Sequence, residues 1–219
     1  MTDPESQMQI RTIGSMSEVS AEMWDACAGQ SNPFVKHGFL SALEDSGSAT
    51  ADSGWAAQHV LLEDSGSGAL LGAVPLYVKN HSYGEYVFDW GWADAYERAG
   101  GRYYPKAQVC VPFTPASGPR LLLGDASDSD THKILGDALV SVARQLQVSS
   151  LHITFPNKSE FDALGELEHY EQRLGVQYHW ENQDYQSFDD FLSQLNSRKR
   201  KAVKKERREV AELDVDIRV

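Results

Sequence analysis

Residues 129–155 read SDTHKILGDALVSVARQLQVSSLHITF, and this stretch decides the fold class. In Ser129–Val148 the apolar side chains recur three and four residues apart, which predicts an amphipathic helix. A short apolar run, Leu151–Phe155, follows directly and predicts a strand. A second predicted strand, Gln108–Thr114, lies before the helix. Strand, helix and strand at this spacing predict two parallel neighbouring strands joined by a crossover helix, and therefore an α/β fold.

The chain before this unit predicts helices followed by an antiparallel β-region. Residues 1–12 are mostly polar and predict a flexible tail. Ser17–Gly29 predicts a first helix, and Asn32 with Pro33 opens a second one as N-cap and first-turn residue. The other predicted elements are the strands His59–Leu62, Leu70–Val78, Glu85–Trp90 and Arg120–Leu123 and a short helix over Asp94–Gly100.

The chain after this unit predicts a short helix, a strand and a long helix. Asn157 is the expected N-cap of a helix that ends near Leu164. Apolar residues at alternate positions over Tyr170–Trp180 predict a long, half-buried strand. Ser187 opens a long helix with an apolar stripe, and Asp214–Val219 predicts a final strand without a partner downstream. We therefore expect this chain to be one part of a longer protein.

The charge of the chain is unevenly distributed. The net charge is −12, yet eight of the 20 basic residues lie in residues 198–208 together with a single acidic residue. The remainder then holds 12 basic against 31 acidic residues. An acidic body with one dense basic segment predicts a local anion site. General affinity for nucleic acid is not expected, because the body repels a long polyanion.

Composition also predicts where the protein is found. The sequence has no apolar run of the roughly 18 residues that a membrane helix needs. Met1–Arg11 has no signal-peptide core, and Cys27 and Cys110 are far apart, without metal-binding spacing. We read both cysteines as reduced, buried thiols and predict a cytoplasmic protein without membrane insertion and without a bound metal.

Several longer motifs, in a fixed order, point to a known family. They are NPFVKHGFL (32–40), PLYVK (75–79), HSYGEYVFD (81–89), YYPK (103–106), VPFTP (111–115), HWEN (179–182) and SRKRK (197–201). Together they resemble the bacterial FemAB-like family, usually labelled GNAT-type N-acetyltransferase or peptidoglycan biosynthesis/recognition protein. The resemblance covers about residues 30–210.

The resemblance implies a fold and a reaction class. It implies a GNAT-like mixed, twisted sheet that is flanked by helices, with residues 13–219 as the N-terminal half of a two-half protein. The missing C-terminal half of the same chain is then an expected partner. The implied donors are acetyl-CoA or another acyl-CoA, or aminoacyl-tRNA. The acidic stretch Leu123–Asp130 stands where a phosphate-binding loop is expected, so this half departs from the acyl-CoA pattern.

Three residues are candidates for catalysis. His152 alternates with Leu151 and Ile153 on its strand, and a histidine there suits a general base or a satisfied core residue. Glu85 and Asp89 lie four residues apart in an extended stretch. They suit the binding and deprotonation of an attacking amine, or the capping of turns.

Other residues are candidates for substrate binding. Tyr103, Tyr104 and Lys106 combine aromatic surface with a cation, which suits either a substrate groove or the packing of a turn. Thr114 ends a strand interrupted by Pro112, where free backbone groups face either a ligand or solvent. His179 is a further candidate. Arg198, Lys201 and Lys205 lie on one face of the basic helix. These three suit the phosphates of a nucleotide-sugar or of aminoacyl-tRNA, or else form a solvated face.

Two functional hypotheses follow. The first is an acyl- or aminoacyl-transferase that acts on the amine of a cell-wall-precursor-like or other small anionic acceptor. The second is a non-catalytic recognition module for peptidoglycan precursors or another anionic ligand. The sequence has no Ser-His-Asp ordering, no CxxC, no HExxH and no Walker-type loop, so hydrolases, zinc enzymes and nucleotide hydrolases have no support.

Overall fold

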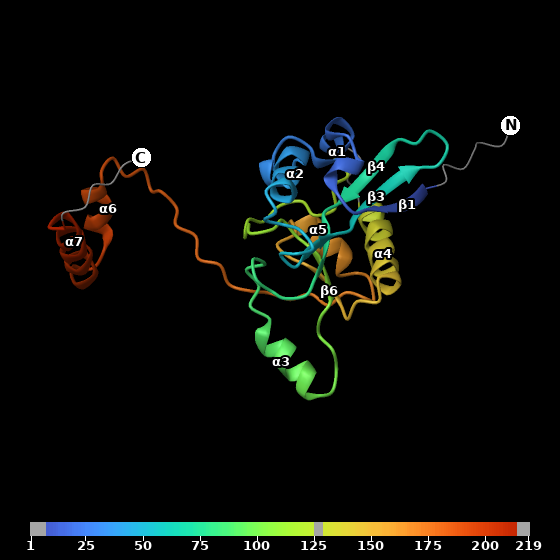
Figure 1. Ribbon diagram of the computed structural model, residues 1–219. Coiled ribbons are helices and arrows are strands. Elements are labelled where there is room, and N and C mark those ends of the chain that lie inside the picture. Colours follow the sequence, from blue (N-terminus) through green and yellow to red (C-terminus); the bar gives the residue numbers. More distant parts are fainter. Residues whose placement is uncertain (1–7, 125–128, 214–219) are drawn as a thin grey trace. The chain divides into compact units, whose positions relative to one another are not determined.

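A computed structural model describes residues 8–124 and 129–213 (Figure 1). The chain divides into two compact units, Met1–Gln172 and Arg173–Val219. The first unit contains both sheets, and the second contains two helices. The strand predicted over Asp214–Val219 lies outside the described residues.

The first unit is built on two small sheets. One has three antiparallel strands in the order β1 (Met8–Ile13), β3 (His59–Asp64) and β4 (Leu70–Val74). The other has the order β2 (Trp55–Ala57), β5 (Leu76–Lys79), β6 (Lys106–Val109) and β7 (Leu151–Ile153). The predicted strand Leu70–Val78 is divided at Pro75, because proline has no N–H to donate to a ladder.

The predicted parallel pair is confirmed. β6 and β7 pair in parallel, with Gln108 opposite His152, and α4 (Ser129–Gln145) connects them in sequence. Both strands are shorter than predicted and end at Val109 and Ile153. The mixed α/β class therefore stands.

Helices form where local caps predict them. Asn32 accepts a hydrogen bond from the Phe34 N–H and opens the 3₁₀ turn Pro33–Val35, which α2 (His37–Asp45) follows. Asn157 opens α5 (Lys158–Leu164) with a capping box to Glu160, as predicted. The predicted helix Ser17–Gly29 is divided into a 3₁₀ turn, Met16–Glu18, and α1 (Ala21–Ala28), and α3 spans Trp90–Arg98.

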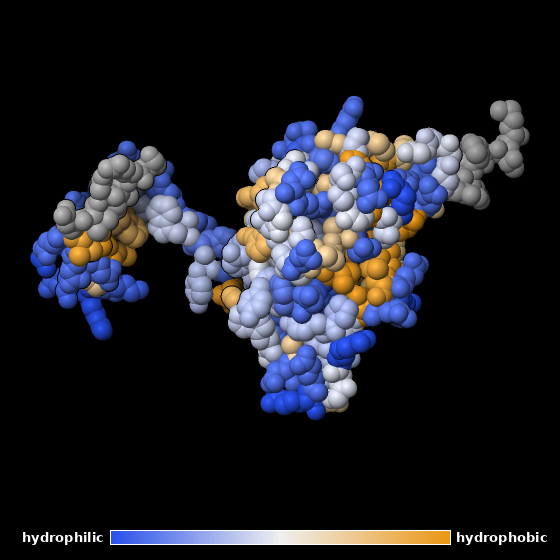
Figure 2. Space-filling model, viewed as in Figure 1, coloured by the Kyte–Doolittle hydropathy of each residue, from blue (hydrophilic) through white to orange (hydrophobic). Residues whose placement is uncertain are grey.

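Helices cover the apolar faces of the sheets. Leu135 and Leu139 of α4 pack in one core cluster with Leu76 and Val109 of the second sheet. Hydrophobic side chains can be seen gathered over α4 in Figure 2. α1 and α2 contribute to another core cluster with the first sheet, which includes Trp24 and Leu40. Both cysteines are free and buried, as predicted.

Several sequence predictions of secondary structure are wrong. Residues 8–12 are not tail, because β1 pairs with β3 along its whole length. Glu85–Trp90 forms no strand. α3 begins at Trp90 rather than Asp94; Asp89 takes the N-cap position, but its carboxylate is bound to Lys106 and makes no capping hydrogen bond. Tyr170–Trp180 forms no strand, and Tyr178 is 98% exposed. Arg120–Leu123 contributes only one bridge, between Ala73 and Leu122.

The second unit has two helices where one was predicted. α6 spans Phe188–Gln194 and α7 spans Ser197–Ala211. The side chain of Asn196 accepts a hydrogen bond from the Lys199 N–H at 2.9 Å and starts α7. The predicted apolar stripe is therefore not continuous: Leu192 is buried, whereas Val210 is 55% exposed.

Candidate functional site

One face of the second sheet carries polar side chains. Lys79 of β5 lies opposite Lys106 of β6, and Tyr77 lies opposite Gln108. Gln108 in turn lies opposite His152 of β7. Cross-strand partners point to the same side of a sheet, so these five residues share one face, which we call the polar face. The opposite face carries the apolar core under α4.

Lys106 is at the centre of a buried ionic cluster. Its ammonium group lies 2.7 Å from Glu85 Oε2, 2.6 Å from Asp89 Oδ2 and 3.0 Å from Ser82 Oγ. The Lys106 side chain is 0% exposed, and both carboxylates are buried. Three acceptors match the three hydrogens of an ammonium group, so Lys106 is fully hydrogen-bonded. The cluster fastens the segment Ser82–Asp89 over the polar face.

Tyr103 and Tyr104 extend the cluster. The Tyr103 hydroxyl donates to Asp89 Oδ2 at 2.7 Å, and the Tyr104 hydroxyl lies 2.8 Å from Ser82 Oγ. The two tyrosine rings meet edge to face at 5.0 Å, and the His152 ring lies 6.2 Å from that of Tyr103. His152 is half-buried, with Nε2 2.9 Å from Ser150 Oγ. The cluster therefore reaches from β6 to the edge strand β7.

Lys79 is a second buried lysine on the polar face. Its ammonium group lies 3.2 Å from the centroid of the Trp55 ring and 3.3 Å from the Tyr83 carbonyl oxygen, to which it donates. Burial lowers the pKa of Lys79 to about 8, because desolvation disfavours the charged form. The neighbouring Glu85 works in the opposite direction but does not cancel this effect.

The two carboxylates of the cluster differ in acidity. Burial raises the pKa of Glu85 above that of an ordinary glutamate, and the nearby Lys106 ammonium opposes this only in part. Burial also acts to raise the pKa of Asp89, but hydrogen bonds, led by that from Lys106, outweigh it and leave the pKa lowered. Two carboxyl groups with pKa values displaced in opposite directions are an arrangement that suits acid–base chemistry.

Four of the five buried polar side-chain atoms without hydrogen-bond partners among the described residues belong to the polar face or to the segment above it, and the fifth is His59 Nδ1 of β3. Among the described residues, Tyr77 OH, Gln108 Oε1, Glu85 Oε1 and Asp89 Oδ1 are buried and have no partner. Buried polar groups are nearly always hydrogen-bonded, so an unpartnered group needs an explanation. Two of these atoms belong to the polar face and two to the segment above it.

The structure brings together most of the residues that the sequence selected. Glu85, Asp89, Tyr103 and Lys106 form one cluster, and Tyr104 and His152 adjoin it. Thr114 does not join by a side-chain bond, since its hydroxyl donates to the Pro112 carbonyl. His179 belongs to the second unit, where its ring is exposed and lies 3.1 Å from Gln177.

Sequence reasoning missed Tyr77, Lys79 and Gln108. A usable signal was present, because polar residues alternate with apolar ones in LYVK (76–79) and KAQV (106–109). Alternation of this kind predicts one polar and one apolar face. The predicted strand began at Gln108, which left Lys106 outside it.

Comparison with known proteins identifies the family. A family model named FemAB-like and described as peptidoglycan biosynthesis/recognition matches residues 15–219. This chain belongs to the FemAB-like family. No curated protein and no solved structure matches it. The matched range includes the polar face, the segment above it and both helices of the second unit.

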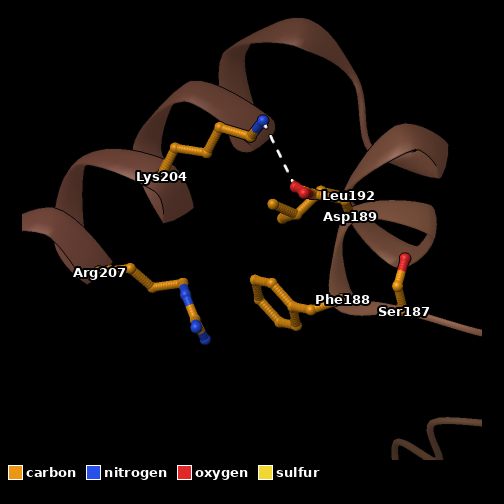
Figure 3. A pocket seen from close by; sticks show the side chains of 6 residues that line it. All are labelled: Ser187, Phe188, Asp189, Leu192, Lys204 and Arg207. Atoms are coloured by element: carbon orange, nitrogen blue, oxygen red, sulfur yellow. Dashed lines mark ion pairs between the residues drawn. The ribbon is translucent and has the colours of Figure 1, made fainter.

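The second unit of this FemAB-like protein carries the basic segment. Arg198, Lys201 and Lys205 lie exposed on α7, and Lys205 pairs with Glu209 at 3.4 Å. α6 and α7 together form a pocket of about 480 Å³ (Figure 3). There the Arg207 guanidinium lies 4.2 Å from the Phe188 ring centroid, and Lys204 pairs with Asp189 at 3.6 Å. The exposed cations of α7 are therefore accessible to an anionic ligand.

Arg200 differs from the other cations of the FemAB-like basic segment. Its guanidinium donates to the carbonyl oxygens of Leu192 at 2.9 Å, Ser193 at 3.1 Å and Leu195 at 2.8 Å. Leu192 and Ser193 lie in the last turn of α6 and Leu195 is its C-cap, where carbonyl oxygens lack N–H donors from a following helical turn. Arg200 therefore holds the two helices together.

Across residues 8–124 and 129–213, no group of three or more His, Cys, Asp or Glu side chains is arranged to hold a metal ion. None of the helices within those ranges is both long and apolar enough to cross a membrane.

Proposed function

We propose that this FemAB-like protein transfers an acyl or aminoacyl group to the amine of an anionic peptidoglycan precursor, with the polar face as the reaction centre. The observation that supports this most is the group of unpartnered buried atoms: Tyr77 OH, Gln108 Oε1, Glu85 Oε1 and Asp89 Oδ1. Glu85 Oε1 and Asp89 Oδ1 are acceptors within the Lys106 cluster, Gln108 Oε1 is a further acceptor on the polar face, and Tyr77 OH is a donor on that face. A substrate amine needs acceptors of this kind, and a carbonyl oxygen needs a donor.

The proposed roles follow from the chemistry of each group. Glu85 takes a proton from the substrate amine, since its raised pKa makes it a better base than an ordinary carboxylate. The amine nitrogen then forms a bond with the donor carbonyl carbon. The bond from that carbon to the thioester sulfur or ester oxygen breaks, and the leaving group takes up a proton. Asp89 and Lys106 position Glu85.

The donor and acceptor are proposed by class. An acyl-CoA, an aminoacyl-tRNA and a nucleotide-sugar acceptor all carry phosphates, and exposed Arg198, Lys201 and Lys205 suit phosphate oxygens. His152 is the more accessible titratable side chain on the polar face and is proposed as an alternative base. A GNAT-like arrangement, a cytoplasmic location and a second half of the same chain as a partner remain part of this proposal.

Recognition without catalysis is the second candidate, and burial supports it. Glu85, Asp89 and Lys106 have nearly no exposed surface. A substrate amine reaches Glu85 only if the segment Ser82–Asp89 moves. If that segment stays closed, the cluster is a support for a binding surface rather than a reaction centre.

An assay of amide formation tests the proposal. Purified protein is incubated with a peptidoglycan nucleotide-sugar precursor and either acetyl-CoA or aminoacyl-tRNA, and the new amide is detected by mass spectrometry. Glu85→Gln should abolish turnover while precursor binding, measured by calorimetry, is retained. Glu63→Gln is the matched control, because Glu63 is also buried but pairs with Arg11 in the other sheet. Binding by the native protein without product would favour recognition.

A further inference from the structure

A groove runs beside the free edge of β2. β2 is the first strand of its sheet, and within the described part of the chain it pairs only with β5. β2 and β3 are separated by one residue, Gln58, so the chain runs on from one sheet into the other. β1 covers the outer edge of β3 and stops at Ile13, opposite His59. β2 and β3 thus share one continuous outer edge. β1 covers this edge along β3 and leaves it open along β2.

The space at this edge is a pocket of about 410 Å³. Four consecutive residues, Trp55–Gln58, line it, together with Gly14 and Ser15 just beyond β1. Successive side chains of a strand point to opposite faces. A pocket that touches four in a row faces the edge of the strand, where the peptide groups are, rather than either face of the sheet.

Peptide groups of β2 point into this groove. The Gln58 N–H donates to the Leu76 carbonyl at 2.9 Å, toward β5. Backbone groups alternate in direction along an antiparallel strand, so those of Ala57 point away from β5. The Trp55 N–H obeys the same alternation and donates to the Thr50 carbonyl at 2.7 Å on the outer side. Ala57 therefore offers a donor and an acceptor, and Trp55 a carbonyl, to an added strand.

The walls of the groove suit a peptide backbone. Ala49, Ala51, Ala56 and Gly14 are lining residues, and their small side chains allow another main chain to come close. Addition of an extended peptide to an open sheet edge is a recurrent mode of recognition, in which main-chain hydrogen bonds supply affinity. The space suits a short segment with small side chains.

One charged residue, Glu44, lines the groove. Its carboxylate accepts from His59 Nε2 at 3.0 Å, from the Met16 N–H at 2.9 Å and from Ser15 Oγ at 2.9 Å. Burial acts to raise the pKa of Glu44, but these hydrogen bonds outweigh it and leave the pKa lowered. The side chain is 12% exposed and lines the groove, so Glu44 contributes negative charge to its wall.

We propose that the groove binds a short extended peptide as a strand beside β2, and that the peptide carries a primary amine which lies toward Glu44. Ala57 supplies the main-chain donor and acceptor, the small lining residues admit the backbone, and Glu44 selects the positive charge. The groove lies at the edge of the same sheet as the polar face, and Trp55, which lines it, also contacts Lys79 of that face. The proposal does not depend on the proposed transferase activity.

Nuclear magnetic resonance titration of the full chain tests this site. The probe is acetyl-Ala-Lys-Ala-amide, and its norleucine analogue lacks the charge. The lysine peptide should shift the amide signals of Gly14, Ser15 and Trp55–Gln58 in a saturable way. Ala57→Pro removes the outward N–H without removing a bond to β5, and should weaken binding roughly fivefold, the effect of one hydrogen bond. Ala57→Ser keeps the N–H and should bind as the native protein does.

Two further variants separate charge from space. Glu44→Gln should weaken binding of the lysine peptide roughly three- to fivefold, to the level of the norleucine peptide. Ala51→Trp should fill the groove and block both peptides, whereas Ala42→Trp, on an exposed position of α2 outside the lining, should not. Thermal melts establish that each variant is folded.

Three results would overturn the proposal. The first is saturable shifts that map outside the groove, and the second is equal weakening by Ala57→Pro and Ala57→Ser. The third is concentration-dependent shifts at Trp55–Gln58 without peptide, which would mean that a second copy of the chain occupies the edge.

Discussion

The polar face and the basic helix α7 both concentrate charge, but they do so in opposite surroundings. On the polar face, Lys79 and Lys106 are fully buried: Lys106 is held by Glu85 and Asp89, and Lys79 by the Tyr83 carbonyl and the Trp55 ring. On α7, eight basic residues share eleven positions, and none of the residues of the helix is buried. The first arrangement fixes its charges in place, whereas the second leaves most of them in water.

Burial determines how the charges of the polar face and those of α7 respond to mutation. A buried charge without a partner costs several kcal/mol, so removal of one member of a buried pair has a large effect. An exposed charge is solvated and screened by salt, so each one contributes little to folding. The polar face should therefore respond to mutation through stability, and α7 through ligand binding.

The largest expected effect is that of Lys106→Met. The change leaves two buried carboxylates without their shared cation and should lower the free energy of unfolding by about 3–5 kcal/mol. Urea denaturation measures it. Lys36→Met is the control, because Lys36 is a partly exposed residue 3.8 Å from Asp25 and should change stability little. Adding Glu85→Gln and Asp89→Asn to Lys106→Met should recover part of the loss, and failure to do so would mean that packing, not charge, explains it.

The next effect is a pH dependence that comes from Lys79. In the folded state its pKa is about 8, below the usual lysine value of 10.5, because burial disfavours the charged form. Between these values the unfolded chain binds more protons, so stability rises with pH, by at most about 3 kcal/mol. Urea denaturation between pH 7.5 and pH 10 should show this rise in the native protein and not in Lys79→Met. Parallel pH profiles for the two proteins would contradict it.

A smaller effect is expected at Gly84, in the segment above the polar face. Its φ is +79°, and an added Cβ would lie 2.6 Å from the Phe113 ring. Gly84→Ala should therefore cost about 1–2 kcal/mol, from backbone strain and the displaced ring. Gly91→Ala is the matched control, since a Cβ there meets nothing within 4 Å and helix α3 gains a better helix former. Equal melting temperatures for the two variants would contradict this reading.

The smallest effect on folding is expected from α7. Reversing Arg198, Lys201 and Lys205 to Glu should leave the unfolding midpoint nearly unchanged, because all three are exposed. Calorimetry with a UDP-sugar should show binding weakened roughly tenfold or more, with a flatter dependence on salt. Arg200→Gln is the contrasting variant: it removes the bonds to α6 and should lower helix content. Unchanged affinity after the reversals would show that α7 is only a solvated face.

Local patterns in the sequence determined much of the fold. The 3.6-residue period of α4 and the apolar run after it predicted the crossover and the parallel pair β6–β7. The caps at Asn32 and Asn157 were also readable, since a cap involves neighbours only two or three residues away. The cap at Asn196 was missed, and a single long helix was predicted in its place.

The sequence by itself determined which kinds of residue the site contains, and the tertiary structure alone decided what each one touches. Glu85, Asp89, Tyr103 and Lys106 were selected as polar and aromatic residues in unusual stretches. The sequence did not show that Lys106 binds carboxylates 17 and 21 residues earlier in the chain. It also did not show that Lys79 lies on the same face. Strand register and the path of the segment above the sheet decide which side chains share a face. Both are set by contacts between distant residues, which no local period records.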